Sequence, residues 1–493
     1  MWFVGIPYLI AIAIISTKAT ATLGNVTQCQ QACQTLESEF PGRVYHDGAD
    51  PNFSIWDQKQ LQTAYVCRVE PSSATEVARV LQILVDTWCR FAVKCGGHSR
   101  YPDDAVSIGG VTIDLALINS TVVSDDRTTA RVGGGALTRQ VYAALDPYGL
   151  AYVGGRVGQV GIGGFALGGG TSVLSGKHGW SVDNILEYEV VLANSTIVTT
   201  SEHQHPDLFY ALRGGGNNFG IVTSFHVGIF PQGAVYAGSR SFSDDQTSRF
   251  LEEAEKIFTI EDAEDVNVGL EYRYAYSAQQ GDFVMSSTQR YSEPVLDPPV
   301  FRDLNGIPAL TNLTGSVNSL ANSTRFSGPL GQTRNVFASL THYPSVELGK
   351  KATEIFKAQW RMSNLTDASP ELITYSIPAG AIQKMKQRGG NALGLDVEGH
   401  LVINLLSLSW ANSESDEVAY SFANRFIDSF SQAAETLDVL HPFIYINYAN
   451  KGQDVFSGYG EENKKRLLAI QRAVDPRGVF TSSGLWRGFF KLH

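Results

Sequence analysis

Apolar residues recur with helical spacing in several segments of the chain. Val77, Val80, Leu81 and Leu84 lie on one face of a predicted helix, and Ser73 with Glu76 fits a capping box at its start. The same periodicity, ended by proline, glycine or a change of pattern, predicts further helices at 137–145, 206–213, 348–361, 416–437 and 461–474.

Short apolar or alternating runs between these helices predict β-strands. They lie at 90–94, 111–117, 185–192, 196–200, 221–230, 401–410 and 443–448. Up to about residue 235, short strands and helices alternate around glycine-rich loops. Residues 236–440 carry longer helices and alternating strands, which favours an antiparallel sheet with helices behind it.

Composition and charge exclude several function classes. The 493 residues are 43% hydrophobic and 18% charged, with a formal net charge of −11. No run of Lys or Arg stands out, so nucleic-acid binding is not expected, because it needs a basic face. His203 and His205 form the one close histidine pair and lack a third ligand, so no metal site is expected. His205 is expected to cap the helix that begins at Pro206.

The first residues predict export from the cell. Residues 1–21 are apolar and end in Ala19-Thr20-Ala21, which is typical of a cleaved signal peptide, and residues 22–59 form a polar lead-in. No later segment is long and apolar enough to cross a bilayer, so no stable membrane insertion is expected after cleavage. Secretion, or residence in the secretory pathway, fits the glycosylation sequons at Asn25, Asn52, Asn119, Asn194, Asn312, Asn322 and Asn364.

The chain has 48 glycines, and three tight clusters of them lie within its first part. They are Cys95-Gly96-Gly97-His98-Ser99, the loop 154–170 and RGGGNNFG at 213–220. Glycines let backbone N–H groups approach a diphosphate closely, so three clusters predict loops that converge on one phosphate-bearing ligand. The G-x-G-x-x-A run from Gly161 does not predict a Rossmann fold, because no apolar strand precedes it and no long helix follows.

Specific motifs carry a resemblance to a known family. The chain resembles the berberine-bridge-enzyme-like flavin oxidases, within the superfamily of vanillyl-alcohol oxidase and p-cresol methylhydroxylase. The similar segments occur in family order and span nearly the whole mature chain. They are FAVKCGGHS (91–99), VGIGGFALGGG (160–170), GWSVDN (179–184), HPDLFYALRGGGNNFGIVTSF (205–225), YINYAN (445–450), YGEENKKRL (459–467) and DPRGVF (475–480).

The resemblance implies an α+β, two-domain vanillyl-alcohol-oxidase-type fold. Residues 60–235 would bind FAD, 236–440 would form an antiparallel-sheet substrate domain, and 441–493 would return to the FAD domain. The implied reaction transfers a hydride from a small organic substrate to flavin N5, and O₂ then reoxidises the flavin. A monomer is expected, acting on an intermediate of secondary metabolism.

The resemblance also implies a covalent bond between His98 and the flavin ring. A histidine that follows two glycines at a strand end can reach a ligand, and neutral imidazole is a nucleophile. The alternative is a histidine that only hydrogen-bonds the flavin or caps a turn. Many relatives add a second link from a cysteine, but Val157 stands at the aligned position. A single covalent link to FAD is therefore expected.

Further site residues follow from the resemblance. Tyr448, with Tyr445 nearby, is the candidate catalytic base, and a carboxylate near Asp396 or Glu398 is the alternative. A tyrosine in an apolar segment is also often a core residue. For Asp183 and Asn184 a plain turn is the alternative. The candidate cofactor-binding residues are Gly96, Gly97, His98, Ser99, Gly161, Gly163, Gly164, Gly168, Gly169, Gly170, Asp183, Asn184, Gly220, Ile221 and Asn447.

The five cysteines all lie in the first fifth of the chain, and their odd number leaves at least one thiol unpaired. They are Cys29, Cys33, Cys67, Cys89 and Cys95. One or two structural disulfides are expected, and the family pattern suggests Cys33 with Cys89. Cys95 is either a redox-active thiol near the flavin or a structural residue.

Three alternative functions remain open from the sequence. A carbohydrate oxidase would present an open, aromatic-lined groove for a sugar. A flavin-dependent cyclase would close a ring without net oxidation. A flavoprotein without turnover would serve in binding or storage.

Overall fold

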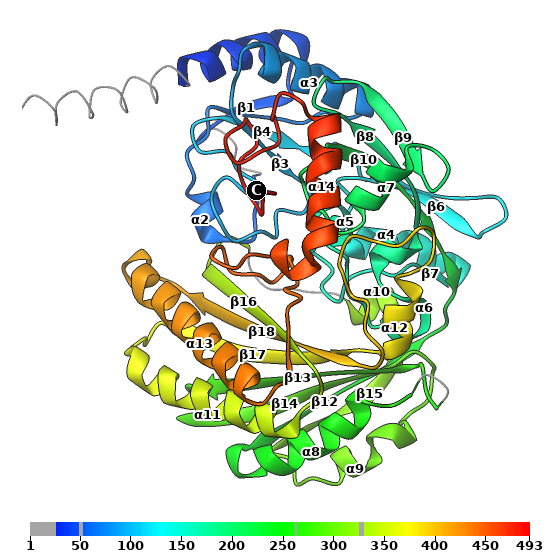
Figure 1. Cartoon of the computed structure of the whole chain (residues 1–493), viewed down its shortest axis with the longest axis vertical. Helices are drawn as coiled ribbons and strands as arrows, with labels where there is room; N and C mark the ends of the chain where they lie inside the picture. The colour runs from blue at the N-terminus through cyan, green and yellow to red at the C-terminus, as the bar shows by residue number, and fades with distance from the viewer. Residues whose placement is uncertain (1–25, 49–52, 262–263, 325–329) are drawn as a thin grey trace, which may run out of the picture.

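The alternating elements of the first part fold into two small sheets (Figure 1). The computed structural model describes residues 26–48, 53–261, 264–324 and 330–493. One sheet has four strands, ordered β1 (Val44–His46), β2 (Cys67–Val69), β4 (Val111–Asp114) and β3 (Phe91–Lys94). The other is antiparallel, ordered β5 (Thr121–Val123), β6 (Thr129–Gly133), β10 (Ile221–Gly228), β8 (Ile185–Val191) and β9 (Ile197–Ser201).

Short helices connect these strands and position the glycine-rich loops. They are α2 (Gln58–Leu61), α3 (Ala74–Asp86), α4 (Thr138–Leu145), α5 (Ile162–Leu167), α6 (Ser175–His178) and α7 (Pro206–Leu212). The helix after Gly161 has only six residues, and the strand before it, β7 (Leu150–Ala151), pairs only with β11 (Phe230–Pro231). This arrangement is not a Rossmann unit, as the sequence indicated.

The second part contains the predicted antiparallel sheet, which has eight strands. Alternating side chains of its strands face opposite sides, so one face can pack on helices and the other on the first part. The order is β15 (Thr311–Asn318), β12 (Val235–Ser243), β14 (Asp282–Tyr291), β13 (Val268–Ser277), β17 (Ala368–Ile377), β18 (Leu401–Trp410), β16 (Arg334–His342) and β19 (Leu440–His441).

Amphipathic helices cover one face of this sheet (Figure 1). In α13 (Asp416–Thr436), Phe422, Phe426 and Phe430 recur at helical spacing and are buried. The long helix α11 (Val346–Ser363), which the periodicity predicted at 348–361, packs beside it. The remaining helices here are α8 (Thr247–Phe258), α9 (Arg302–Asn305), α10 (Leu320–Ser323) and α12 (Ala379–Lys384).

The C-terminal segment returns to the first part of the molecule. Helix α14 (Glu461–Val474) packs on α7, as Figure 1 shows. Beyond it, Phe91 N–H donates to the Leu485 carbonyl at 3.0 Å, and the Asn218 side chain donates to the Phe490 carbonyl at 3.0 Å. These bonds join the chain end to β3 and to the third glycine cluster.

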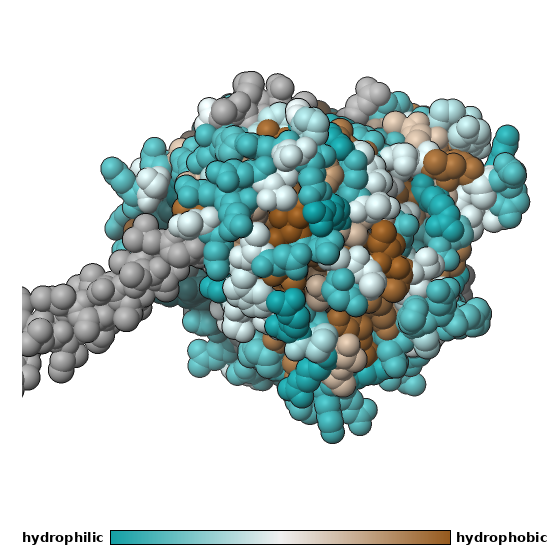
Figure 2. Space-filling model, turned by 90° about the horizontal axis from the view of Figure 1, so that it is seen from above, coloured by the Kyte–Doolittle hydropathy of each residue, from teal (hydrophilic) through white to brown (hydrophobic). Residues whose placement is uncertain are grey.

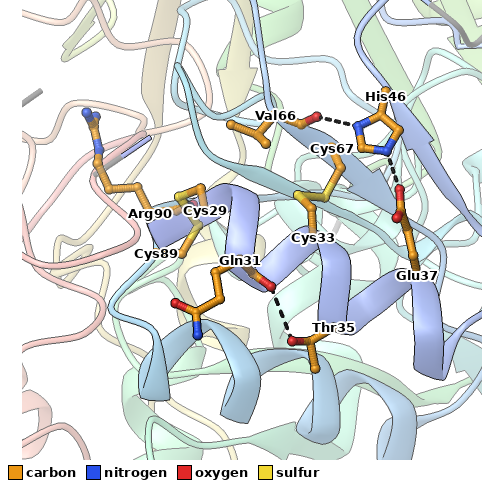
Figure 3. The surroundings of a disulfide bond; sticks show 10 residues. All are labelled: Cys29, Gln31, Cys33, Thr35, Glu37, His46, Val66, Cys67, Cys89 and Arg90. Atoms are coloured by element: carbon orange, nitrogen blue, oxygen red, sulfur yellow. Dashed lines mark hydrogen bonds and ion pairs between the residues drawn. A yellow bond between two sulfur atoms is a disulfide. The ribbon is translucent and has the colours of Figure 1, made fainter. Parts of the chain in front are cut away.

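The lead-in contains a helix that the sequence pattern did not predict. Residues 26–39 are helical and carry Cys29 and Cys33 four positions apart. Residues at this spacing share one helix face, so both sulfurs point into the adjacent core. The disulfides are Cys29–Cys89 and Cys33–Cys67 (Figure 3). The expected Cys33–Cys89 pairing is therefore wrong, because each cysteine of the helix faces a different element.

Three local predictions also need correction. The strand at 111–117 ends at Asp114, whose side chain accepts from Ala116 N–H and starts a 3₁₀ turn. Residues 443–448 form no strand, since Tyr448 N–H bonds back to the Tyr445 carbonyl in a turn. His205 precedes α7 with left-handed backbone, φ 50°, but its side chain makes no capping bond.

Polar side chains cover most of the surface that faces the viewer in Figure 2, at the end carrying α3. Apolar residues appear there in small separate groups, which is ordinary for a solvated face. Among the helices of the described residues, none has the length and apolarity that a membrane span requires. The candidate signal peptide and the sequons at Asn25 and Asn52 lie outside the described residues.

Candidate active site

A cavity of about 460 Å³ lies between the glycine-rich loops and the eight-stranded sheet. Strands β13, β14, β17 and β18 contribute one wall, and Trp486 and Phe489 of the C-terminal segment contribute another part. All three glycine clusters reach the lining. Their glycines there include Gly96, Gly97, Gly161, Gly163, Gly164, Gly216 and Gly220.

The glycines of the lining have two different roles. A Cβ on Gly96 would lie 2.4 Å from the backbone nitrogen of Gly161, which is closer than atoms can approach. These two glycines therefore allow one loop to pass directly against the other. At Gly164 a Cβ would meet no atom within 4 Å, and the residue lines the cavity. Its missing side chain leaves open space for a ligand.

His98 follows β3 and reaches the cavity between two loops. Its imidazole stacks on the indole of Trp56, with ring centroids 4.1 Å apart and 9° between the planes. Burial, and secondarily the charge of Arg100, lower the pKa of His98 to about 4. The ring is therefore neutral at physiological pH, which is the nucleophilic form.

Next to the sheet wall of the cavity, a tyrosine of the C-terminal segment is hydrogen-bonded to an arginine of the second glycine loop. Arg156 donates a hydrogen bond to the Tyr448 hydroxyl at 2.9 Å and pairs with Glu271 at 3.3 Å. The same guanidinium lies over the ring of Tyr375, 4.2 Å from its centroid. Burial alone would lower the pKa of Arg156, but the nearby Tyr448 oxygen and the Glu271 carboxylate raise it. The wall thus presents a polar cluster beside the apolar part of the cavity.

Four buried polar side-chain atoms of the lining, on Arg100, Asn217, Tyr375 and Trp486, have no hydrogen-bond partner in the described part of the chain. Among them are the side-chain oxygen of Asn217 and the indole nitrogen of Trp486. Buried polar atoms are nearly always satisfied, so these two point to a polar ligand at that end of the cavity. With the open space at Gly164, the lining suits a long ligand such as FAD.

Comparisons with known proteins agree with this geometry. Residues 66–201 match the family described as FAD binding domain. The FAD-dependent monooxygenase tpcD of Cochliobolus heterostrophus is 33% identical, covering 96% of both chains. The FAD-dependent monooxygenase FUP4 of Fusarium proliferatum is 32% identical, covering 93% of this chain and 94% of the relative. The chain belongs to the same family of FAD-dependent oxidoreductases as these fungal relatives.

Solved structures show that this oxidoreductase shares the fold of known flavin oxidases. 6-Hydroxy-D-nicotine oxidase from Arthrobacter nicotinovorans superposes with a TM-score of 0.75 at 22% identity, over 91% of this chain and 98% of that chain. Xylooligosaccharide oxidase from Myceliophthora thermophila gives 0.75 at 19% identity, over 95% and 99%. Berberine bridge enzyme gives 0.74 at 15% identity, over 94% and 98%. The expected vanillyl-alcohol-oxidase-type fold is confirmed.

Tyr445 and Asn447 of the oxidoreductase brace the second glycine loop. The Tyr445 hydroxyl accepts from Gly170 N–H at 3.1 Å, from Thr171 N–H at 3.3 Å and from the Asn447 amide at 3.0 Å. Asn447 also donates to the Phe165 carbonyl at 3.0 Å. Both residues line the cavity beside Tyr448, but the oxygen of Tyr445 is already occupied by three donors.

Five predicted cofactor-binding residues of the oxidoreductase lie outside the cavity lining. They are Gly168, Gly169, Gly170, Asp183 and Asn184. The Asp183 carboxylate accepts from Trp180 N–H at 2.9 Å and from the Asn391 amide at 2.9 Å. Asn184 donates to two backbone carbonyls of the same turn. These contacts support the turn interpretation, and direct contact with the cofactor stays a prediction.

The other predicted site residues line the cavity. They are Gly96, Gly97, His98, Ser99, Gly161, Gly163, Gly164, Gly220, Ile221, Tyr445, Asn447 and Tyr448.

Val157 and Cys95 are neighbours of the cavity whose chemistry bears on a cysteine link to a cofactor. Val157 lines the cavity where many relatives carry the second cysteine. Cys95 is a free thiol that also lines the cavity. Burial raises its pKa, so the protonated, unreactive form is favoured. This supports the structural interpretation of Cys95 over a redox role.

Glu271 is the carboxylate that the eight-stranded sheet contributes to the cavity lining, and the sequence pattern did not single it out. Asp396 is exposed and pairs with Lys386, and Glu398 is also exposed. Neither lines the cavity, so the alternative base at these positions is wrong. Trp56 and Arg156 were missed as well. Trp56 lies in a segment without a motif, and although Arg156 lies in the second glycine loop, that loop's pattern does not indicate which residue its side chain contacts.

Proposed function

We propose that the protein is an oxidase that holds FAD through one covalent bond to His98 and oxidises a small organic substrate of secondary metabolism. The observation that supports the bond most directly is the neutral imidazole held against Trp56 at the end of β3. His98 needs no proton transfer to become a nucleophile, and the stack restrains its ring. Val157 leaves the opposite side without a second link.

FAD, when bound, accepts a hydride equivalent from a substrate C–H bond and passes the electrons to O₂. The residues of the chain bind the substrate and handle its proton. Tyr448 faces the cavity with its oxygen in a hydrogen bond from Arg156, whose positive charge stabilises negative charge on that oxygen. Tyr448 is therefore the candidate to accept the proton of a substrate hydroxyl, and Arg156 positions it.

Anaerobic mixing tests the redox assignment. Purified protein is mixed with alcohols, phenols, sugars and organic acids while the visible absorbance of the oxidised flavin is followed. The proposal expects at least one class to bleach the flavin and expects air to restore the colour with release of hydrogen peroxide. Turnover of a substrate without bleaching and without O₂ consumption would instead support the non-redox cyclase.

A monooxygenase is the second candidate, because the curated relatives carry that name. An oxidase releases one hydrogen peroxide for each O₂ consumed, whereas a monooxygenase leaves one oxygen atom in the product. Measuring O₂ and peroxide together, with ¹⁸O₂ and mass analysis of the product, separates the two. Stoichiometric peroxide and unlabelled product support the oxidase.

Export and glycosylation belong to the same proposal. The described sequon residues Asn119, Asn194, Asn312, Asn322 and Asn364 are all exposed. Two disulfides tie the N-terminal helix to the first sheet, which fits an oxidising compartment. Secretion from the native host, with mass loss on treatment with an N-glycosidase, tests this part. We also expect a monomer, which the mass in solution checks.

A further inference from the structure

The sheet wall of the cavity is rich in guanidinium groups. Alternate residues of β13 and β14 face the cavity, and they include Glu271, Arg273, Thr288 and Arg290. The intervening residues Tyr272 and Gln289 are buried on the other face of the sheet and do not line the cavity. With Arg156 from the second glycine loop, three arginines line this side of one cavity.

Carboxylates neutralise only part of this charge. Glu271 pairs with Arg156 at 3.3 Å and with Arg273 at 2.8 Å, so one carboxylate serves two arginines. Glu371 lies 3.9 Å from Arg273, at the limit of an ion pair. These ion pairs involve Arg156 and Arg273. The third arginine of the wall, Arg290, forms no ion pair with either carboxylate.

Among Arg156, Arg273 and Arg290, only Arg290 has no carboxylate within 4.0 Å in the described part of the chain. Its one hydrogen bond goes to the Gln289 carbonyl at 3.3 Å. Gly269 of β13 is the residue paired with Arg290 of β14, and it has no side chain that could cover the arginine. Burial lowers the pKa of Arg290, Glu271 raises it, and Arg156 and Arg273 lower it further. An anion bound next to Arg290 would offset both the burial of its charge and the repulsion from Arg156 and Arg273.

We propose that Arg290, assisted by Arg273, binds a planar oxyanion of the substrate, either a carboxylate or an acidic enolate. A guanidinium forms two parallel hydrogen bonds to such a group, and the partly dry cavity strengthens them. The substrate is then an organic acid rather than a neutral sugar, since a sugar leaves the Arg290 charge uncompensated. This inference rests on the proposed function, because it assigns the substrate class of the same cavity.

Binding of simple probes tests the substrate class without turnover. Benzoate represents the carboxylate, tetronic acid the acidic enol and benzamide the neutral isostere, each titrated by calorimetry into the purified protein at neutral pH. The wild-type protein should bind at least one anion about tenfold or more tighter than benzamide, a difference of ~1.4 kcal/mol. Which anion binds tighter decides between carboxylate and enolate.

Variants assign the effect to one side chain. Arg290→Gln should lose the preference for the anion, and Arg290→Lys should keep only part of it, because lysine lacks the planar fork. Arg240→Gln is the matched control, since Arg240 lies on β12 of the same sheet, pairs in register with buried Ser287 and does not line the cavity. It should bind the probes like the wild-type protein.

Several outcomes overturn the inference. They are no measurable binding of either anion, equal binding of benzamide, or an anion preference that survives in Arg290→Gln. Flavin content is read from the absorbance of each sample, independently of the heat of binding. Flavin without anion preference defeats the anionic-substrate inference alone, whereas a protein without flavin defeats the proposed function.

Discussion

The His98 imidazole lies flat on the Trp56 indole, with 4.1 Å between the ring centroids. The two residues come from different segments, which are further joined by the bond from Trp56 N–H to the Gly97 carbonyl at 3.2 Å. The segment before α2 therefore fixes the orientation of the histidine that we expect to carry the flavin. This gives Trp56 a positioning role in cofactor attachment.

Removing the stack should impair covalent attachment more than folding. An aromatic pair is worth ~0.5–1.5 kcal/mol, which corresponds to roughly two- to tenfold in the population of the aligned ring. Trp56→Ala should reduce the fraction of flavin that stays with acid-precipitated protein, and Trp56→Phe should retain most of it. Trp88→Ala is the control, because Trp88 is 39% exposed and lies outside the cavity lining. An unchanged covalent fraction in Trp56→Ala would contradict the positioning role.

Tyr448→Phe should slow turnover while leaving flavin content unchanged. Loss of a proton-transferring group costs about 10²–10⁴-fold in rate. Arg156→Gln should also lower kcat and should shift the pH profile, because the charge next to the Tyr448 oxygen is gone. The control is Tyr272→Phe, because Tyr272 lies on the face of β13 that packs on the helices and does not line the cavity. A kcat within about twofold of the wild type in Tyr448→Phe would exclude Tyr448 as the base, given that range.

Tyr445→Phe should behave differently from its neighbour. The change leaves three donors, Gly170 N–H, Thr171 N–H and the Asn447 amide, without their shared acceptor. Each buried donor left unpaired costs ~1–3 kcal/mol, so the melting temperature should fall clearly. We expect kcat to change far less than in Tyr448→Phe. Unchanged stability together with a large loss of kcat would instead give Tyr445 a catalytic role.

The two disulfides should each contribute to stability. They close loops with sequence separations of 60 and 34 residues. Removal of such a bond from a secreted protein costs ~2–5 kcal/mol. Denaturant unfolding of the Cys29→Ser/Cys89→Ser and Cys33→Ser/Cys67→Ser double variants should show losses in this range. Cys95→Ser is the control without a disulfide. A Cys33–Cys89 bond in a peptide map of the wild-type protein would refute the Cys29–Cys89 and Cys33–Cys67 pairing.

Elements with a strong repeat were predictable from the sequence. The phenylalanines of α13 and the apolar run of β18 each carry one clear period, so their bounds agree with the prediction within a few residues. The glycine clusters were recognised because close backbone approach leaves few alternatives to glycine, as at Gly96 and Gly161. His98 was recognised because it stands directly beside one of these clusters.

Residues that act through distant partners were not predictable. Tyr448 and Arg156 are 292 positions apart, and neither sequence segment indicates that the other is its partner. Residues 443–448 look like a strand because they are apolar, yet their backbone forms a turn closed by the bond from Tyr448 N–H to the Tyr445 carbonyl. The helix at 26–39 is largely polar by sequence, and two disulfides join it to partners that are distant in the sequence. Tertiary contacts decide all three cases.

Acid precipitation of the purified protein tests the central claim most directly. Wild-type protein should keep its yellow colour in the pellet, and its mass should exceed the apoprotein mass by one FAD. His98→Ala should leave the flavin in the supernatant, while Cys95→Ser should behave like the wild type. A colourless pellet from the wild-type protein, or a covalent flavin that persists in His98→Ala, would contradict attachment through His98.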